Sequence, residues 1–310
     1  MQPRPPALRP QVLAAATVAP LLLLTACSDG SGADGAVSGA EPAASTATAA
    51  EGGAEGGGEG ADPAAADAVP PQLLTMEVIA EHPWDDSAFT QGLEIDDDRS
   101  LLVGTGQRGE SAIYRVPDWR NDPGHVDRHD LPEEFFGEGI TRAGDTVWQL
   151  TWQENTAIAR DAATLEETHR AEYDTEGWGL CAFQDELVMS DGTGTLTFRD
   201  PVTFDALREV EVTAAGNPVT HLNELECVDG ADGPEVWANI WTTNEIARID
   251  PATGIVTGAV DASALREGMT PEQADRADVF NGIAHIPGTD HFLVTGKWWP
   301  TLFEVRFTPA

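Results

Sequence analysis

The sequence predicts an all-β fold, a five-bladed β-propeller built from residues 73–310. The main observation is a three-residue motif that recurs five times, at spacings of 47, 40, 45 and 58 residues. A repeat of roughly 40 to 50 residues is typical of propeller blades. Two runs that alternate apolar and polar residues follow each copy, as expected of half-buried strands. The copies are Gln91-Gly92-Leu93, Glu138-Gly139-Ile140, Trp178-Gly179-Leu180, Asn223-Glu224-Leu225 and Asn281-Gly282-Ile283.

Residues 1–27 are predicted to be a signal peptide. Two arginines precede an apolar run over residues 12–24, which is shorter than the roughly 20 residues that span a bilayer but suits a signal peptide. The run ends in Leu24-Thr25-Ala26-Cys27, which resembles the lipobox of bacterial lipoproteins and implies cleavage before Cys27 and a lipid on its sulfur. We therefore expect an exported protein anchored on the outer side of the bacterial cytoplasmic membrane. The alternative is secretion, with Cys27 present by chance.

Residues 28–72 are predicted to be a disordered, acidic linker rich in Ala and Gly. They include eight Asp or Glu residues and no Lys or Arg. Such a composition buries too little apolar surface to offset the chain entropy lost on folding.

Composition also excludes several partners and cofactors. The formal net charge is −36, and 16 of the 17 basic residues are Arg, which leaves Lys297 as the single lysine. Nucleic acids and anionic lipid surfaces are bound through clustered Lys and Arg, so neither is expected beyond the lipid anchor. No Cys or His cluster has the spacing of zinc ligands, and we expect no metal or other cofactor. We also expect a monomer.

Cys181 and Cys227 are the only other cysteines. Export would allow a disulfide between them. The register of the repeat places them on opposite faces of their strands, however, and we therefore expect two free, buried thiols.

Each of the first four repeat units contains four predicted strands. The fifth lacks a fourth strand because the chain ends at Ala310, and the run over residues 73–80 is predicted to supply it, which removes an exposed sheet edge. The longest insertion, about residues 262–280, contains Thr270 and Pro271, which predict a helix start with Thr270 as N-cap. We expect this insertion to cover one face of the propeller.

The leading residue of each motif copy should lie at one mouth of the central channel. The flanking positions repeat while this position varies among Gln91, Glu138, Trp178, Asn223 and Asn281, as expected of a site built on a repeated scaffold. Trp152, Trp241 and Lys297 follow the second strands of their units and form a further ring. Glu138 follows two phenylalanines, and a carboxyl in apolar surroundings has a raised pKa that suits acid/base work.

Seven segments together resemble the plant and bacterial type of glutaminyl-peptide cyclotransferase, over nearly all of residues 73–310. This family folds as a five-bladed propeller. Ile140, where Leu is usual, and the positions of Cys181 and Cys227 are small departures. The segments are Phe89-Thr90-Gln91-Gly92-Leu93, Phe136-Gly137-Glu138-Gly139-Ile140-Thr141, Gln149-Leu150-Thr151-Trp152, Gly177-Trp178-Gly179-Leu180, Leu222-Asn223-Glu224-Leu225-Glu226, Trp237-Ala238-Asn239-Ile240-Trp241 and Val294-Thr295-Gly296-Lys297-Trp298.

The resemblance implies an aminoacyltransferase that cyclises the N-terminal glutamine of peptides or proteins to pyroglutamate and releases ammonia. It implies Glu138 as the catalytic acid/base. On chemical grounds we expect Lys297 or Asn223 to hydrogen-bond the amide oxygen as negative charge develops there. The implied substrate-pocket residues are Phe89, Gln91, Phe136, Trp152, Trp178, Asn223, Trp241 and Lys297.

Two other functions fit the residues less well. A metal-dependent propeller hydrolase, such as a lactonase, would hold Ca²⁺ with Glu138, Asn223, Glu224 and Asn281, but a lysine and three tryptophans around that centre disfavour it. A non-catalytic binding propeller has no need of a Glu and a Lys inside an aromatic pocket.

Overall fold

The computed structural model describes residues 69–230 and 233–310. The predicted signal peptide 1–27, the predicted lipidation site Cys27 and nearly all of the predicted linker 28–72 lie outside the described residues. Strands dominate the described part, which also contains the short helices α2 (Ser263–Glu267) and α3 (Pro271–Arg276). No helix within these ranges is long and apolar enough to cross a membrane.

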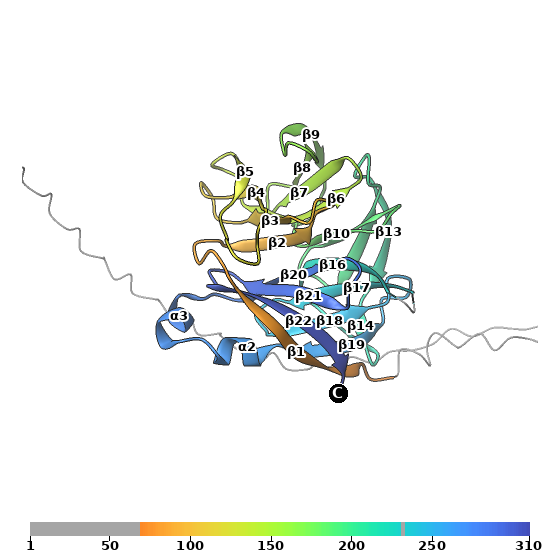
Figure 1. The fold of residues 1–310 in the computed structure, drawn as a ribbon. Coiled ribbons are helices and arrows are strands. Elements are labelled where there is room, and N and C mark those ends of the chain that lie inside the picture. The colour runs from red at the N-terminus through yellow and green to blue at the C-terminus, as the bar shows by residue number, and fades with distance from the viewer. Residues whose placement is uncertain (1–68, 231–232) are drawn as a thin grey trace, which may run out of the picture. The chain divides into compact units, whose positions relative to one another are not determined.

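The strands form five antiparallel blades of four, so the predicted five-bladed propeller is confirmed (Figure 1). Blade 1 consists of β2 (Thr90–Ile95), β3 (Leu101–Thr105), β4 (Ala112–Val116) and β5 (Val126–Asp130). Blade 2 consists of β6 (Gly137–Ala143), β7 (Thr146–Thr151), β8 (Thr156–Asp161) and β9 (Glu167–Glu172). Blade 3 consists of β10 (Leu180–Ala182), β11 (Leu187–Ser190), β12 (Thr195–Arg199) and β13 (Ala206–Glu211).

Blades 4 and 5 complete the ring. Blade 4 consists of β16 (Leu222–Gly230), β17 (Gly233–Ile240), β18 (Glu245–Ile249) and β19 (Val256–Asp261). Blade 5 consists of β20 (Phe280–His285), β21 (His291–Gly296), β22 (Thr301–Pro309) and β1 (Gln72–Pro83). A hairpin that the repeat did not predict, β14 (Thr213–Ala214) with β15 (Asn217–Pro218), lies between blades 3 and 4.

The first strands of neighbouring blades contact one another in a closed ring, β2–β6–β10–β16–β20–β2. These strands are largely buried, whereas the fourth strands of blades 1 to 3 are mostly exposed. Five apolar clusters fill the five gaps between neighbouring blades. Trp148 and Trp237 belong to two of these clusters.

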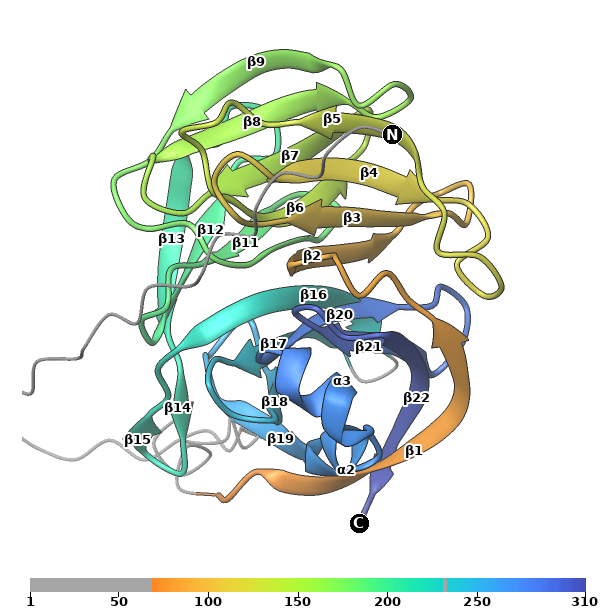
Figure 2. The same ribbon diagram turned by 90° about the vertical axis from the view of Figure 1, so that its left-hand side faces the viewer.

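Strand β1 closes the ring as predicted. It pairs antiparallel with β22, from Leu74 opposite Pro309 to Pro83 opposite Thr301, and Figure 2 shows the two strands side by side. Its first three residues also pair in parallel with β19, with Gln72 opposite Gly258. Because of this second pairing, which the sequence did not predict, blades 4 and 5 form one eight-stranded sheet.

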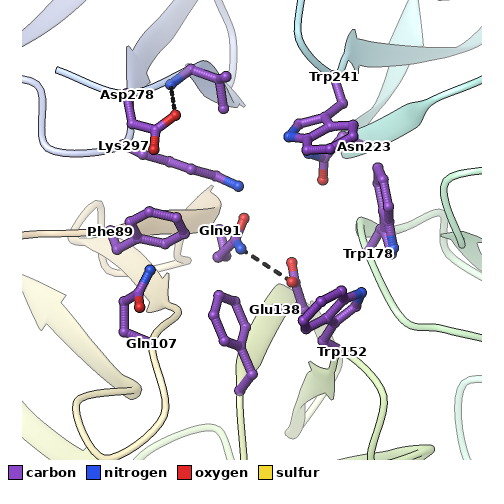
Figure 3. Close-up of a pocket in the computed structure, with 12 residues that line it drawn as sticks. Phe89, Gln91, Gln107, Glu138, Trp152, Trp178, Asn223, Trp241, Asp278 and Lys297 are labelled. Atoms are coloured by element: carbon purple, nitrogen blue, oxygen red, sulfur yellow. Dashed lines mark hydrogen bonds between the residues drawn. The ribbon is translucent and has the colours of Figure 1, made fainter. Parts of the chain in front are cut away.

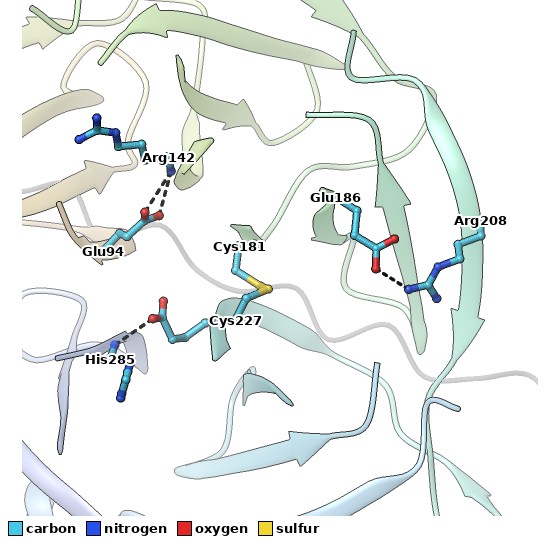
Figure 4. The surroundings of a disulfide bond; sticks show 8 residues. Glu94, Arg142, Cys181, Glu186, Arg208, Cys227 and His285 are labelled. Carbon is cyan, nitrogen blue, oxygen red and sulfur yellow. Dashed lines mark hydrogen bonds and ion pairs between the residues drawn. A yellow bond between two sulfur atoms is a disulfide. The ribbon is translucent and has the colours of Figure 1, made fainter. Parts of the chain in front are cut away.

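Cys181 and Cys227 form a disulfide, with 5.3 Å between their Cα atoms, so the expectation of two free thiols is wrong (Figure 4). The reason lies in how blades stack. Leu180 packs toward blade 2, whereas its neighbour Cys181 packs toward blade 4, in the same cluster as Leu225. One face of a blade thus meets the opposite face of the next blade. Side chains with opposite orientations in successive blades are therefore the ones that meet.

The insertion between blades 4 and 5 contains the predicted helix start. The Thr270 side chain accepts a hydrogen bond from the backbone N–H of Gln273, and the Gln273 side chain accepts one from the backbone N–H of Thr270. This capping box satisfies two N–H groups at the start of α3. Arg266 donates to the carbonyls of Ala277 and Asp278, at 2.9 and 2.7 Å. These bonds fix the segment that leads into β20.

Candidate active site

A cavity of about 290 Å³ lies where the first strands of the blades begin (Figure 3). The structure brings together all nine residues that the resemblance assigned to catalysis or substrate binding. It adds three that the sequence did not single out, Gln107, Asp278 and Val279. The lining consists of Phe89, Gln91, Gln107, Phe136, Glu138, Trp152, Trp178, Asn223, Trp241, Asp278, Val279 and Lys297.

One backbone hydrogen bond, repeated in four blades, explains why residues from two strands meet here. The residue after the second strand donates its N–H to the carbonyl of the residue two before the motif. The bonds run from Gly106 to Phe89 (2.9 Å), from Trp152 to Phe136 (2.9 Å), from Trp241 to His221 (2.9 Å) and from Lys297 to Val279 (3.0 Å). In an antiparallel blade, the end of the second strand thus lies beside the start of the first.

A chain of two amide side chains, Asn281 and Gln91, leads to Glu138. Gln91 donates from Nε2 to Oε1 of Glu138 at 3.1 Å. Asn281 in turn donates from Nδ2 to Oε1 of Gln91 at 3.3 Å and to the carbonyl of Thr90 at 3.1 Å. Asn281 therefore does not line the cavity, although it leads its motif, and it orients Gln91 instead.

Glu138 is only 5% exposed. Burial raises its pKa well above the usual value, the Lys297 charge opposes this shift, and the charges of Glu176 and Glu154 add to it. The group therefore keeps its proton to a higher pH than an exposed glutamate does. A carboxyl with this property can donate and accept a proton near neutrality.

Lys297 is likewise only 5% exposed. Burial lowers its pKa, while the charges of Glu138 and Asp278 oppose that shift. Its Nζ lies 4.7 Å from the centroid of the Phe89 ring, and among the described residues no side chain or carbonyl accepts a hydrogen bond from it. This ammonium group is thus available to a bound molecule.

Aromatic rings form the remaining walls. Phe136 contacts Phe89 and Trp152 edge to face, with ring centroids 6.0 and 5.6 Å apart. Trp178 and Trp241 meet in the same way at 5.3 Å. Trp241 is 36% exposed, so it marks the solvent edge of the pocket.

Glu176 is a further residue that the sequence analysis missed. Its carboxylate accepts hydrogen bonds from the indole N–H groups of Trp152 and Trp178. A signal was present, because Glu176 occupies the same repeat position as Phe89 and Phe136, two residues before the leading residue. Gln107 likewise follows the second strand of blade 1, near the position that Trp152 occupies in blade 2.

The residues that a Ca²⁺-dependent hydrolase would use do not converge. Glu138 and Asn223 line the cavity, whereas Glu224 accepts backbone N–H bonds from Leu93 at 3.1 Å and Ile283 at 2.7 Å. Across residues 69–230 and 233–310, no three His, Cys, Asp or Glu side chains form a group that could hold a metal ion.

Similarity to known proteins shows which family this chain belongs to. A sequence model described as glutamine cyclotransferase matches residues 55–307. The chain belongs to this family. A glutaminyl-peptide cyclotransferase of Arabidopsis thaliana is 36% identical over 236 residues, which cover 76% of this chain and 72% of the relative. The crystal structure of Myxococcus xanthus glutaminyl cyclase is similar with a TM-score of 0.69 and 35% identity, covering 77% of this chain and 99% of that one.

Membership of the glutamine cyclotransferase family confirms the resemblance read from the motifs, the fold that it implied and the enzyme class. The roles of the individual cavity residues stay predictions.

Proposed function

We propose that this member of the glutamine cyclotransferase family cyclises N-terminal glutamine of peptides or proteins in the cavity around Glu138. The products are pyroglutamate and ammonia. The observation that carries the proposal is a buried carboxyl of raised pKa, hydrogen-bonded by Gln91 in an aromatic pocket that also holds a buried ammonium group. Peptide substrates are the partners that this reaction requires.

In the proposed reaction, the substrate's α-nitrogen attacks the carbon of its own side-chain amide. A new C–N bond closes a five-membered ring, and the bond to the amide nitrogen breaks. Glu138 takes a proton from the attacking nitrogen and returns one to the departing nitrogen, which leaves as ammonia. Both nitrogens belong to one molecule, so a single carboxyl beside them can serve both transfers.

Lys297 and Asn223 are proposed to hold the polar atoms of the substrate. The Lys297 ammonium donates to the amide oxygen as negative charge develops there. The Oδ1 atom of Asn223 is buried and has no hydrogen-bond partner among the described residues, so it is free to accept one from the substrate's nitrogen. An unpaired buried acceptor is costly, and a bound N–H group would remove that cost.

The aromatic walls are proposed to keep the glutamine side chain folded and to exclude water. Water at the reacting carbon would yield glutamate instead of pyroglutamate. Phe89, Phe136, Trp152, Trp178 and Trp241 supply these walls, and rigid apolar surfaces of this kind select one conformer of a small ligand.

We also propose that the enzyme acts outside the cytoplasm as a lipoprotein anchored at Cys27. This proposal is supported by the segment from Leu24 to Cys27.

The decisive test is ammonia release from a synthetic peptide with N-terminal glutamine, with the peptide product identified by its loss of one ammonia in mass. Glu138→Gln cannot exchange the proton, so turnover should fall by at least about a hundredfold, with an unchanged melting temperature. Wild-type turnover in this variant would refute the role of Glu138. Cyclisation should also survive EDTA, whereas activity that disappears with EDTA would favour the metal-dependent alternative.

A further inference from the structure

Two of the tryptophans in the pocket wall share one hydrogen-bond acceptor. Trp152 Nε1 donates to Oε2 of Glu176 at 2.7 Å, and Trp178 Nε1 donates to the same oxygen at 3.0 Å. The other carboxylate oxygen accepts from Gln153 Nε2 at 2.9 Å. Glu176 itself does not line the cavity. In Figure 3 the indole nitrogens of Trp152 and Trp178 lie on the side of the rings away from Lys297.

The two tryptophans come from different blades, so their relative position is not set by one sheet. Trp152 follows β7 in blade 2, and Trp178 precedes β10 in blade 3. The chain around Glu176 joins them, because the N–H of Gly177 donates to the carbonyl of Trp152 at 2.8 Å. The Trp178 ring is also closely packed against Gly192, since a Cβ added there would lie 2.6 Å from the ring.

We propose that Glu176 is a positioning residue that holds Trp152 and Trp178 as one rigid wall of the substrate pocket. The inference rests on the proposed function, because the wall matters for folding the glutamine side chain toward its own amine. A carboxylate suits this task because it accepts several N–H bonds, and bonds to a charged acceptor are about twice as strong as neutral ones. A wall misplaced by about 1 Å can slow such a reaction about a hundredfold.

Glu176 also acts on Glu138 through its charge. The pKa of Glu176 lies below its usual value. Burial acts to raise this pKa, but the hydrogen bonds from Gln153, Trp178 and Trp152 together lower it by more. Its negative charge in turn adds to the rise in the pKa of Glu138. A test must therefore separate the position of the indoles from the charge beside the catalytic carboxyl.

Two substitutions make this separation. Glu176→Gln removes the charge but keeps a carbonyl oxygen that can accept both indole N–H bonds. Glu176→Leu removes both the charge and the acceptor. The matched control is Glu235→Leu, which deletes the carboxylate that accepts from Trp237 Nε1 at 3.1 Å, in a core cluster between blades 4 and 5.

Steady-state kinetics on an N-terminal glutamine peptide should rank the variants. We expect kcat/KM to fall about a hundredfold in Glu176→Leu, through both kcat and KM, and less than about tenfold in Glu176→Gln. Without the negative charge the pKa of Glu138 falls, so the acidic limb of the pH profile should move to lower pH in both. Glu235→Leu should stay within about twofold of wild type.

Hydrogen exchange at the indole N–H groups, followed by NMR, provides a readout independent of activity. The Trp152 and Trp178 protons should be protected in wild type and in Glu176→Gln, and exposed in Glu176→Leu. Equal kcat/KM in the two Glu176 variants, or unchanged indole protection in Glu176→Leu, would overturn the positioning role. A wild-type protein that cyclises no glutamine peptide would refute the proposed function, and the exchange experiment would still decide whether Glu176 fixes the wall.

Discussion

At the scale of single residues, the cavity contains a buried acid and a buried base whose ionised forms stabilise each other. Burial shifts both groups toward their neutral forms, since it raises the pKa of Glu138 and lowers the pKa of Lys297. Each charge opposes the shift of the other. The protonation state of the Glu138 carboxyl therefore depends on Lys297, although no direct ion pair links them among the described residues.

Lys297→Met tests this coupling. Without the positive charge, the pKa of Glu138 should rise further, so the acidic limb of the pH–rate profile should move to higher pH. Loss of the proposed hydrogen bond from Lys297 to the substrate's amide oxygen should lower kcat by about a hundredfold. Lys297→Arg keeps the charge but not the shape of the donor, so it should lower kcat and leave the limb in place. A limb that does not move in Lys297→Met would show that the two groups titrate independently.

At the scale of strands, the sequence repeat predicted the five blades because their strands alternate apolar and polar residues. It predicted the closing strand because the fifth unit lacks a fourth strand. The parallel pairing of β1 with β19 covers three residues, which is too short to leave a pattern in the sequence. The nine cavity residues could be placed because the motifs locate strand ends. Glu176 and Asn281 could not be assigned, because their roles depend on hydrogen bonds between blades and not on residue type.

The disulfide shows a related limit. A repeat in sequence gives the orientation of each side chain within its own blade, and Cys181 and Cys227 were placed correctly in this sense. It does not say which face of a blade meets the next. That information comes from the stacking of Leu180 toward blade 2 and of Leu225 toward blade 3.

Neighbouring leucines on β1 offer a test of ring closure. Leu74 is 8% exposed and belongs to the apolar cluster between blades 4 and 5, whereas Leu73 is 70% exposed. Leu74→Ala should lower the free energy of unfolding by about 2–5 kcal/mol, and Leu73→Ala should change it by less than about 0.5 kcal/mol. Urea denaturation measures both. If Leu74→Ala lowered the free energy of unfolding no more than Leu73→Ala does, β1 would add little to the closure of the ring.

At the scale of the whole molecule, the proposed location outside the cytoplasm rests on the predicted signal peptide, residues 1–27. The acidic linker predicted over residues 28–72 would tether the propeller to a lipid on Cys27. Stable anchoring of a protein to a membrane takes two or more lipid chains, because a single chain holds it only weakly. An anionic bilayer would repel the acidic propeller surface. Attachment should therefore depend on lipid modification of Cys27 and not on the propeller surface.

Cys27→Ser in the full chain, expressed in a bacterium, should therefore move the protein from the membrane fraction to the soluble fraction. Incorporation of labelled palmitate should disappear with it, while cyclotransferase activity per molecule stays the same, because the cavity is built entirely from residues 89–297. Cys181→Ser is a suitable control, since it removes a cysteine of the disulfide and leaves the lipobox intact. A Cys27→Ser protein that remains in the membrane fraction would contradict the anchor, and label retained in this variant would place the lipid elsewhere.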